Sequence, residues 1–208
     1  METLLDRIGV DSRVTLVLHD WGGPIGMTWA SRHPERVARL VVFNTAAFLL
    51  PAGKRLHWSL RWSIGSRLAA LLILGFNAFV RTVTHVGCRL KPMPAEVAGA
   101  YRAPHDSWGN RLSTLRFVED IPLTPEHPSY QMLKDTDESL SGFRDTPMLL
   151  CWGGKDFVFD RDFLDEWVRR FPQAEVHRFP EAGHCLLEEV PDQIEVLMRD
   201  FFARHPLG

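Results

Sequence analysis

The chain has 208 residues, of which 45% are hydrophobic and 24% are charged, with 24 Lys and Arg against 26 Asp and Glu. This composition is typical of a globular domain and excludes collagen-like, disulfide-scaffold and disordered chains. The basic residues are unevenly spread, because residues 51–102 contain eight Lys and Arg but a single acidic residue, Glu96. No nucleic-acid-binding motif accompanies this basic excess, so no nucleic-acid partner is expected.

The amino-terminal residues lack the apolar core of a secretory signal, since Glu2 and Asp6 interrupt them. The longest apolar stretch, residues 68–80, contains Gly75 and Asn77 and is shorter than the ~20 residues that a transmembrane helix needs. The three cysteines show no paired spacing, which is typical of a reducing compartment. We therefore expect a cytoplasmic protein without a transmembrane segment.

Three continuous apolar runs, each closed by a turn residue, predict parallel strands that are buried on both faces. They lie at residues 14–18, 40–43 and 148–152. A fourth segment, residues 175–179, alternates between apolar and polar residues, which predicts a half-exposed edge strand. The sequence therefore predicts a sheet of about four strands.

Helical patterns separate these strands. A Gly-led segment follows the first strand and ends near Pro34, and apolar residues recur at helical spacing over 164–171 and again over 194–202. Asp160 is the expected N-cap of the helix that contains residues 164–171. Strands that alternate with helices in this way predict an α/β fold with a parallel sheet.

The interval between the second and third strands, residues 50–145, breaks this alternation. It is rich in Trp, Arg and Pro, and its apolar spacing over residues 56–83 is mostly helical. The chain is therefore divided into a first core part (1–49), a helical lid (50–145) and a second core part (146–208). The basic excess falls on the lid, where it forms either a solvated helix face or a surface for acidic partners or lipid headgroups.

Asp20 lies where the first strand meets the Gly-led helix. The segment VTLVLHDWGGPIGM has the context of a nucleophile elbow, with an aspartate in place of serine and with Leu18 where the motif has its first glycine. A carboxylate is already anionic at neutral pH and attacks carbon without a general base. Asp20 is therefore the candidate nucleophile, and the alternative is that it only caps the helix.

The run HDWGG, which contains Asp20, resembles the nucleophile motif of the haloalkane dehalogenase and epoxide hydrolase branch of the α/β-hydrolases. In that branch the triad follows the order aspartate nucleophile, acid, histidine. The run WGGKD resembles the acid turn and implies Asp156 as the acid, and EAGH resembles the histidine loop and implies His184 as the base. All three residues follow predicted parallel strands, whose carboxyl ends meet at one edge of a sheet.

The resemblance also implies roles for neighbours of the nucleophile. Trp21 would direct its indole N–H at a leaving halide or an oxyanion, and its backbone N–H would serve the oxyanion hole; packing in the core or against the lid is an equal alternative. His19 precedes the nucleophile in the family as well, and no chemistry is assigned to it. The histidines have no HxH or HExxH spacing, so neither a metal site nor a cofactor is expected.

The lid gives a narrower resemblance. Short runs in and around the lid are similar to the dehalogenase-like β-lactone decarboxylases of bacterial long-chain olefin biosynthesis. The runs are NTAAF, GFNAF, YRAP, DSW, RFVEDIPL and KDFVFD, and the similarity extends from Met1 to about His205. Those enzymes convert a cis-disubstituted β-lactone to a cis-alkene and carbon dioxide. The resemblance implies that Asp20 opens the lactone ring, at the alkyl carbon or at the carbonyl, and that His184 acts on protons or through its charge. The substrate would be a hydrophobic small molecule, and association with other enzymes of such a pathway stays open.

Two related activities compete with this interpretation. A haloalkane dehalogenase would displace halide with Asp20, and His184 would then activate water to hydrolyse the ester. An epoxide hydrolase would need two lid tyrosines, and the only tyrosines of the chain, Tyr101 and Tyr130, both fall in the predicted lid. Trp108 is a further candidate lid contact.

The beginning of the family's domain has no counterpart in the chain. That part carries four strands and an oxyanion loop of His-Gly-x-Pro type, whereas residues 1–8 resemble the helix just before the nucleophile strand, and His-Gly-x-Pro does not occur. Val14–Leu18 would then be an uncovered apolar edge. The chain is expected to be an amino-terminally truncated, carboxyl-terminal half of an α/β-hydrolase, and an inactive fragment is the non-enzyme alternative.

Overall fold

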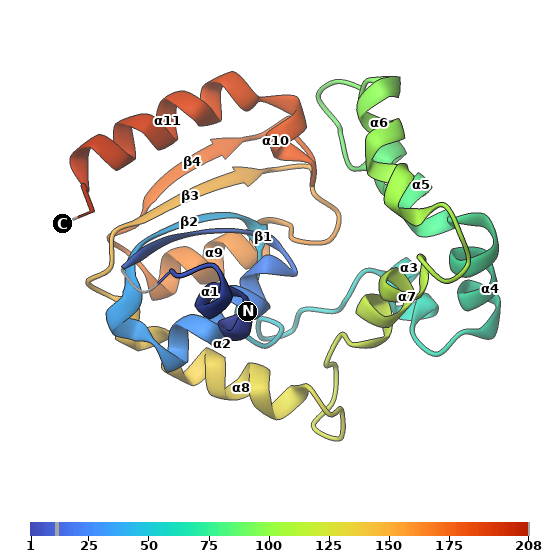
Figure 1. Ribbon diagram of the computed structural model, residues 1–208, viewed down its shortest axis with the longest axis horizontal. Helices are drawn as coiled ribbons and strands as arrows, with labels where there is room; N and C mark the ends of the chain where they lie inside the picture. The colour runs from blue at the N-terminus through green and yellow to red at the C-terminus, as the bar shows by residue number, and fades with distance from the viewer. Residues whose placement is uncertain (11–12, 208) are drawn as a thin grey trace.

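The computed structural model describes residues 1–10 and 13–207, and it has the expected parallel sheet in its centre (Figure 1). The four strands lie in the order β1-β2-β3-β4, and each neighbouring pair is parallel. The described sheet therefore has β1 at one edge and β4 at the other. The strands span β1 (Val14–Asp20), β2 (Val37–Thr45), β3 (Met148–Gly153) and β4 (Glu175–Phe179).

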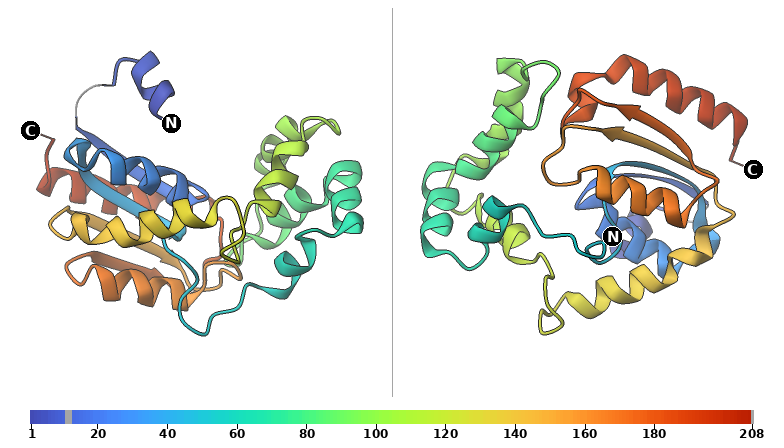
Figure 2. Two further views of the ribbon diagram at one scale, coloured as in Figure 1. Left: turned by 90° about the horizontal axis from the view of Figure 1, so that it is seen from below. Right: turned by 180° about the vertical axis from the view of Figure 1, so that it is seen from behind.

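Helices cover both faces of this sheet (Figures 1 and 2). Their bounds are α1 (Glu2–Arg7), α2 (Gly22–Arg32), α3 (Trp58–Ser63), α4 (Arg67–Phe76), α5 (Ala78–Val86), α6 (Ala95–Arg102), α7 (Leu112–Glu119), α8 (Tyr130–Ser139), α9 (Arg161–Arg170), α10 (Leu186–Glu189) and α11 (Pro191–Arg204). Short 3₁₀ turns occupy Pro34–Arg36, Ala103–His105 and Leu140–Phe143.

The two faces of the sheet explain why its central strands are continuously apolar. Along β2, Leu40 and Val42 face the core beneath α2 and α9, while Val41 and Phe43 face the core beneath α10 and α11. β3 divides its residues between the same two cores. Because successive side chains of a strand point to opposite faces, a strand covered on both sides has no polar alternation. β4 has partly exposed residues along its whole length, as expected for an edge strand.

The helices of the second core part begin and end close to the predicted residues. Asp160 precedes α9, and its carboxylate accepts a hydrogen bond from the backbone N–H of Asp162 at 3.1 Å. This interaction satisfies one of the free N–H groups of the first helical turn. Trp167 of α9 and Phe201 of α11 are fully buried against opposite faces of the sheet. The apolar spacing thus identified the buried face of each helix.

Helices α3 to α7 form a separate layer beyond the carboxyl ends of the strands (Figure 1). This layer has a small core of its own, which consists of Ile73, Leu74, Leu115 and Val118. Helix α8 does not lie in it, because α8 runs beside α2 below the sheet (Figure 2). Residues 140–143, which follow α8, join the core of the sheet. We therefore propose that the lid ends before α8 rather than at residue 145.

Within the described residues, no single helix is long and apolar enough to cross a membrane. The pair α4 and α5 passes such a test of length and composition only when both are taken together, and the two helices meet at an angle of 78°. Asn77 makes this bend, since it adopts a left-handed backbone conformation (φ +54°) and its side-chain amide donates to the carbonyl oxygen of His105 at 3.1 Å. Asparagine tolerates this conformation better than most residues.

Candidate active site

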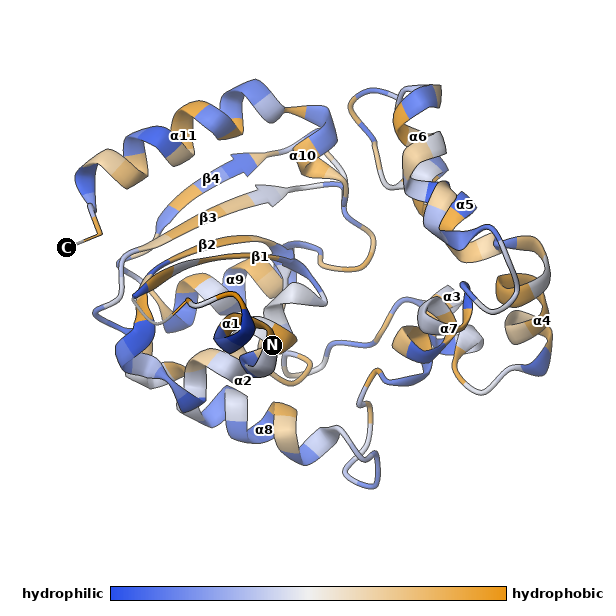
Figure 3. Ribbon diagram, viewed as in Figure 1, coloured by the Kyte–Doolittle hydropathy of each residue, from blue (hydrophilic) through white to orange (hydrophobic). Residues whose placement is uncertain are grey.

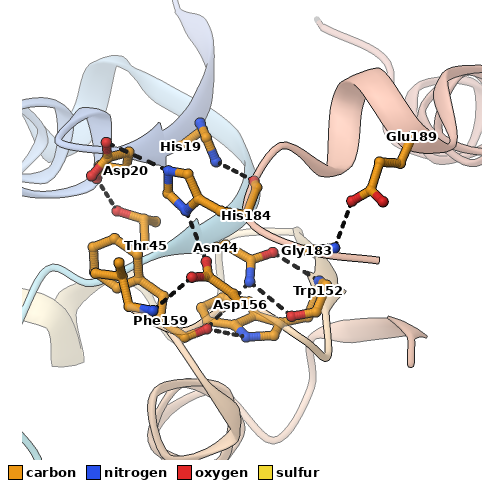
Figure 4. Close-up of polar contacts among 12 residues, drawn as sticks. His19, Asp20, Asn44, Thr45, Trp152, Asp156, Phe159, Gly183, His184 and Glu189 are labelled. Carbon is orange, nitrogen blue, oxygen red and sulfur yellow. Dashed lines mark hydrogen bonds and ion pairs between the residues drawn. The ribbon is translucent and has the colours of Figure 1, made fainter. Parts of the chain in front are cut away.

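Three carboxyl-terminal strand ends bring together the residues that the sequence proposes as a triad (Figure 4). Asp20 is the last residue of β1, Asp156 lies in the turn after β3, and His184 lies in the loop after β4. His184 Nδ1 is 2.8 Å from Asp156 Oδ2, and His184 Nε2 is 3.6 Å from Asp20 Oδ2. The imidazole therefore bridges two carboxylates, although 164 residues separate Asp20 from His184 in the chain.

The backbone of Asp20 has the strained geometry of a nucleophile elbow. Its φ is +50°, in the left-handed region that non-glycine residues rarely occupy, and α2 begins two residues later. The hydroxyl of Thr45 donates to the carbonyl oxygen of Asp20 and ties the turn to the end of β2. Gly23 packs so closely that a Cβ there would overlap Thr45 Oγ1 and the carbonyl oxygen of Ala46. The sharp turn and the absent side chain together project the Asp20 carboxylate beyond the sheet.

Burial and charge act in opposite directions on this cluster. Burial lowers the pKa of His184, but the charge and hydrogen bond of Asp156, together with the contact to Asp20, outweigh it and raise the pKa to about 10. Burial raises the pKa of Asp20, but His184, His19 and the backbone N–H of Trp21 outweigh this effect and leave the pKa below its usual value. Both shifts favour an ion pair between the Asp20 carboxylate and the His184 imidazolium.

His19 supports the backbone of the histidine loop. Its Nε2–H donates to the carbonyl oxygen of His184 at 2.9 Å, and the two rings lie 4.6 Å apart. Burial and the neighbouring charge of His184 both lower the pKa of His19. A neutral His19 can donate this hydrogen bond without placing a second positive charge beside His184. The sequence identified this residue but gave no reason for its place.

The acid loop is held by a buried amide on the neighbouring strand. Asn44, at the end of β2, donates from Nδ2 to the carbonyl oxygens of Gly153 and Phe159 at 3.0 and 3.2 Å, and its Oδ1 accepts from the N–H of Gly153 at 2.8 Å. The indole N–H of Trp152 donates to the same carbonyl oxygen of Phe159 at 2.9 Å. Asp156 Oδ1 in turn accepts from the N–H of Val158 at 2.8 Å. These bonds fix the carboxylate that orients His184.

The histidine loop is fastened to the lid by Glu189, a buried carboxylate of α10 that is 3% exposed. Its Oε2 accepts from the N–H of Gly183 at 2.5 Å, and its Oε1 accepts from the N–H groups of Arg89, at 2.6 Å, and Leu90. The carbonyl oxygen of Gly87 accepts from the N–H of Cys185 at 2.9 Å in the same contact. One carboxylate thus links the loop that carries His184 to the segment between α5 and α6.

A cavity of about 850 Å³ lies between the triad and the lid, and its volume is toward the upper end of the range, roughly 300–1,000 Å³, that is usual for ligand sites. Asp20 and His184 line it from the sheet side. Its other walls are mostly apolar residues of the lid and of the acid loop, such as Leu72, Ile73 and Phe79. The triad therefore meets a cavity that suits an apolar ligand.

Trp21 also lines this cavity, and its ring lies 5.2 Å from that of Phe117 on α7. Tyr101 lines the cavity too, but its hydroxyl donates to Glu188 at 2.8 Å. Tyr130, the first residue of α8, and Trp108, which is 55% exposed, are outside the set of described residues that line the cavity. The structure thus brings Trp21 and Tyr101 to the cavity wall and leaves the other two candidates away from it.

Two of these supporting residues were not foreseen. Asn44 acts on backbone groups that lie 109 and 115 residues away in sequence, and Glu189 on groups that lie 6 to 100 residues away. Such contacts leave no spacing pattern in a single sequence. The sequence offered weak signals: Asn44 follows the apolar run LVVF and opens NTAAF, one of the runs that carry the resemblance, and Glu189 follows LLE.

Comparison with known proteins agrees with this geometry. Residues 1–191 match the family model for the alpha/beta hydrolase fold. The chain therefore belongs to the α/β-hydrolase fold family, and the fold class expected from the sequence is confirmed.

The particular relatives confirm the narrower resemblance. The chain is 46% identical over 203 residues to the cis-3-alkyl-4-alkyloxetan-2-one decarboxylase of Shewanella oneidensis, with coverage of 98% of this chain and 64% of that protein. It is 41% identical over 207 residues to the decarboxylase of the same name from Xanthomonas campestris pv. campestris, with coverage of 100% and 69%. Both relatives are enzymes. The chain spans only 64% of the length of the Shewanella relative.

Solved structures point to the dehalogenase branch. The crystal structure of haloalkane dehalogenase DbeA from Bradyrhizobium elkani matches with a TM-score of 0.85 and 26% sequence identity, covering 97% of this chain and 70% of that one. The described sheet and lid therefore have the arrangement of a dehalogenase-like α/β-hydrolase.

Proposed function

We propose that this chain carries the nucleophile, acid and histidine of an enzyme that decarboxylates a cis-β-lactone to a cis-alkene. The observation that carries the proposal is an aspartate elbow, Asp20, paired with His184 beneath an apolar cavity. The two curated decarboxylases act, by their name, on 3,4-dialkyl oxetan-2-ones, which are four-membered β-lactones with two alkyl substituents. The cavity of about 850 Å³ offers apolar walls to such chains.

The reaction proceeds through a covalent adduct on Asp20. Attack of a carboxylate oxygen on the alkyl carbon C4 forms a C–O bond, breaks the ring C–O bond and releases the substrate carboxylate. That carboxylate then leaves as carbon dioxide, its C–C bond electrons form the alkene, and the bond to Asp20 breaks. The second step restores Asp20 as a free carboxylate, so the two steps together consume no water. Inversion in the first step and anti elimination in the second convert a cis-lactone to a cis-alkene. Attack at the carbonyl carbon stays open as the other first step.

His184 acts in this scheme through its charge. Its imidazolium lies 3.6 Å from the attacking carboxylate, and Asp156 holds it there at 2.8 Å. A positive charge near the ring oxygen favours the carboxylate that develops when the ring opens. Trp21 lines the same cavity, and we propose that it supplies a donor to that oxygen.

A haloalkane dehalogenase is the second candidate, because the DbeA structure shares this arrangement. In that reaction a neutral His184 would remove a proton from water, which then hydrolyses the ester on Asp20. An epoxide hydrolase is less well supported, since Tyr101 donates to Glu188 and Tyr130 is away from the described cavity wall. These activities differ in one respect that is easily measured: hydrolysis gives an alcohol or a diol, and decarboxylation gives an alkene.

The decisive comparison supplies the chain with a cis-3,4-dialkyl β-lactone, a 1-haloalkane and an epoxide, and analyses products by gas chromatography. We expect cis-alkene from the lactone alone, and loss of at least about 10⁴-fold in rate for Asp20→Ala. Alcohol from the haloalkane would favour the dehalogenase instead. Diol formation that requires both tyrosines would favour the epoxide hydrolase.

Absence of product from all three substrates would support the inactive-fragment alternative. Circular dichroism of the Asp20→Ala and wild-type chains controls for folding. Association with other enzymes of the same pathway is a separate proposal, and co-purification of the chain with them would test it.

A further inference from the structure

The lid exposes six large apolar side chains. They come from α3, α4 and the segment before α7, and we refer to them as the outer lid patch: Trp58 (74% exposed), Phe76 (65%), Leu68 (56%), Trp108 (55%), Leu71 (49%) and Trp62 (48%). Contiguous exposed apolar surface of this kind marks an interaction site in most proteins.

Helix α4 is apolar on both of its sides. Ile73 and Leu74 face the small core of the lid, while Leu68 and Leu71 face outward. Arg67 is the only charged residue among its ten. A helix that is apolar all round is normally buried on all sides, so the outward face of α4 lacks a partner within the described chain.

The patch is continuous across the lid. α3 and α4 are in contact, and a Cβ on Gly75 would lie 3.7 Å from the ring of Trp108 and 3.8 Å from Leu71. Figure 3 shows the strongly hydrophobic ribbon of α4 at the outer end of the lid. Trp108 and the outward face of α4 therefore belong to one surface, and α3, which carries Trp58 and Trp62, packs beside α4.

Basic residues lie on the same helices as this surface. Arg61 lies on α3 and Arg67 begins α4, and both are exposed. Glu96 is the only acidic residue in the interval 51–102, and the exposed Asp106 lies two residues before Trp108. Apolar side chains beside exposed arginines, with tryptophans among them, are typical of helices that lie in the interface of an anionic membrane.

We infer that the outer lid patch docks onto the surface of an anionic lipid bilayer. The short helices and the 78° bend between α4 and α5 suit helices that lie in the membrane plane rather than cross it. Trp58 and Trp62 line the cavity as well as the patch. Docking would therefore place the lid side of the cavity against the lipid, so that an apolar ligand could enter without passing through water. The inference concerns binding alone and does not depend on the proposed reaction.

Vesicle flotation tests this inference directly. The chain is mixed with vesicles of phosphatidylcholine alone or of phosphatidylcholine with phosphatidylglycerol, and the floated protein is measured. We expect binding to the anionic vesicles, weaker binding to the neutral ones, and a decrease with added salt. The triple variant Leu68→Gln, Leu71→Gln, Phe76→Gln should bind at least about tenfold more weakly. Arg61→Gln with Arg67→Gln should lower binding to anionic vesicles while changing binding to neutral vesicles little.

Matched variants elsewhere on the surface separate docking from general stickiness. Val196→Gln, on α11, and Val17→Thr, on β1, replace apolar residues that are 66% and 50% exposed far from the patch, and both should bind as the wild type does. The inference would be overturned if the control variants lost as much vesicle binding as the patch variants. It would also be overturned if the chain did not bind anionic vesicles, or bound anionic and neutral vesicles equally. Circular dichroism checks that every variant is folded. Because the substituted residues are exposed, their loss should not unfold the lid.

Discussion

The loops at the sheet edge and the outer helices of the lid differ in how they are held. Around the triad, buried side chains from neighbouring elements fix the backbone: Asn44 holds the acid loop and Glu189 holds the histidine loop. The outer lid instead packs around four small-core residues and exposes large apolar side chains to its surroundings. The loops that carry the candidate triad therefore have buried polar supports, while the outer lid presents exposed apolar surface.

Glu189 and Lys54 are two of the residues through which the two regions meet. Glu189 joins the histidine loop to the segment between α5 and α6. Lys54, in the strap that leads into the lid, pairs with Asp160 and Asp162 at the start of α9. Substitutions in the two regions should therefore lower the free energy of unfolding by different amounts.

The largest loss of stability is expected at the elbow. Gly23→Ala places a Cβ against Thr45 and the carbonyl oxygen of Ala46, which neither the strand nor the turn can avoid, and should lower the free energy of unfolding by about 3 kcal/mol or more. Gly22→Ala is the matched control, because nothing lies within 4 Å of a Cβ there. Urea denaturation measures both. Equal stability of the two variants would show that the elbow is less rigid than described.

Glu189→Gln should cause the second-largest loss of stability. The glutamine amide keeps one acceptor oxygen but turns its NH₂ group toward backbone N–H donors. The buried charge-assisted hydrogen bonds are then lost, which should lower the free energy of unfolding by about 2–3 kcal/mol. Because this network positions the loop of His184, the rate should fall with it. Glu188→Gln removes the charge of a half-buried neighbour while its amide oxygen can still accept from Tyr101, so it should change stability by less than about 0.5 kcal/mol. Similar effects of both would argue against a special role of Glu189.

The charge of His184 gives the third prediction. Its pKa is raised from 6.5 to about 10 in the folded chain, so the protonated ring stabilises the fold fully below about pH 6.5. This contribution is lost as the pH rises from there through the folded-state pKa. The stability of the wild type should therefore fall more steeply between pH 6.5 and 10 than that of His184→Gln, in denaturation curves measured across this range. Parallel slopes would indicate a neutral imidazole.

The smallest effect is expected at the lid strap. Lys54→Met removes the pair with Asp160 and Asp162, and partly exposed pairs are usually worth less than about 1 kcal/mol. Denaturation at low and high salt should therefore show a small loss that shrinks further with salt. A loss as large as that of Glu189→Gln would remove the distinction between the two regions.

The sequence predicted the parts of the molecule that depend on local pattern. Continuous apolar runs identified β1, β2 and β3, the Asp20 turn identified the elbow, and chain order placed Asp156 and His184 at strand ends. The limit of the lid was not predictable in the same way, because α8 is amphipathic whether it packs on the lid or on α2. Nor were the roles of Asn44 and Glu189, since their partners are backbone groups brought near only by folding.

Isotope analysis of Asp20 distinguishes decarboxylation from hydrolysis. The wild-type protein is incubated with a cis-β-lactone in ¹⁸O-labelled water and then digested, and mass spectrometry measures the mass of the peptide that contains Asp20. We expect cis-alkene in solution and no ¹⁸O in the Asp20 carboxylate, because carbon dioxide and alkene leave without hydrolysis. Incorporation of ¹⁸O into Asp20 in step with product formation would contradict it, since water would then have released the adduct.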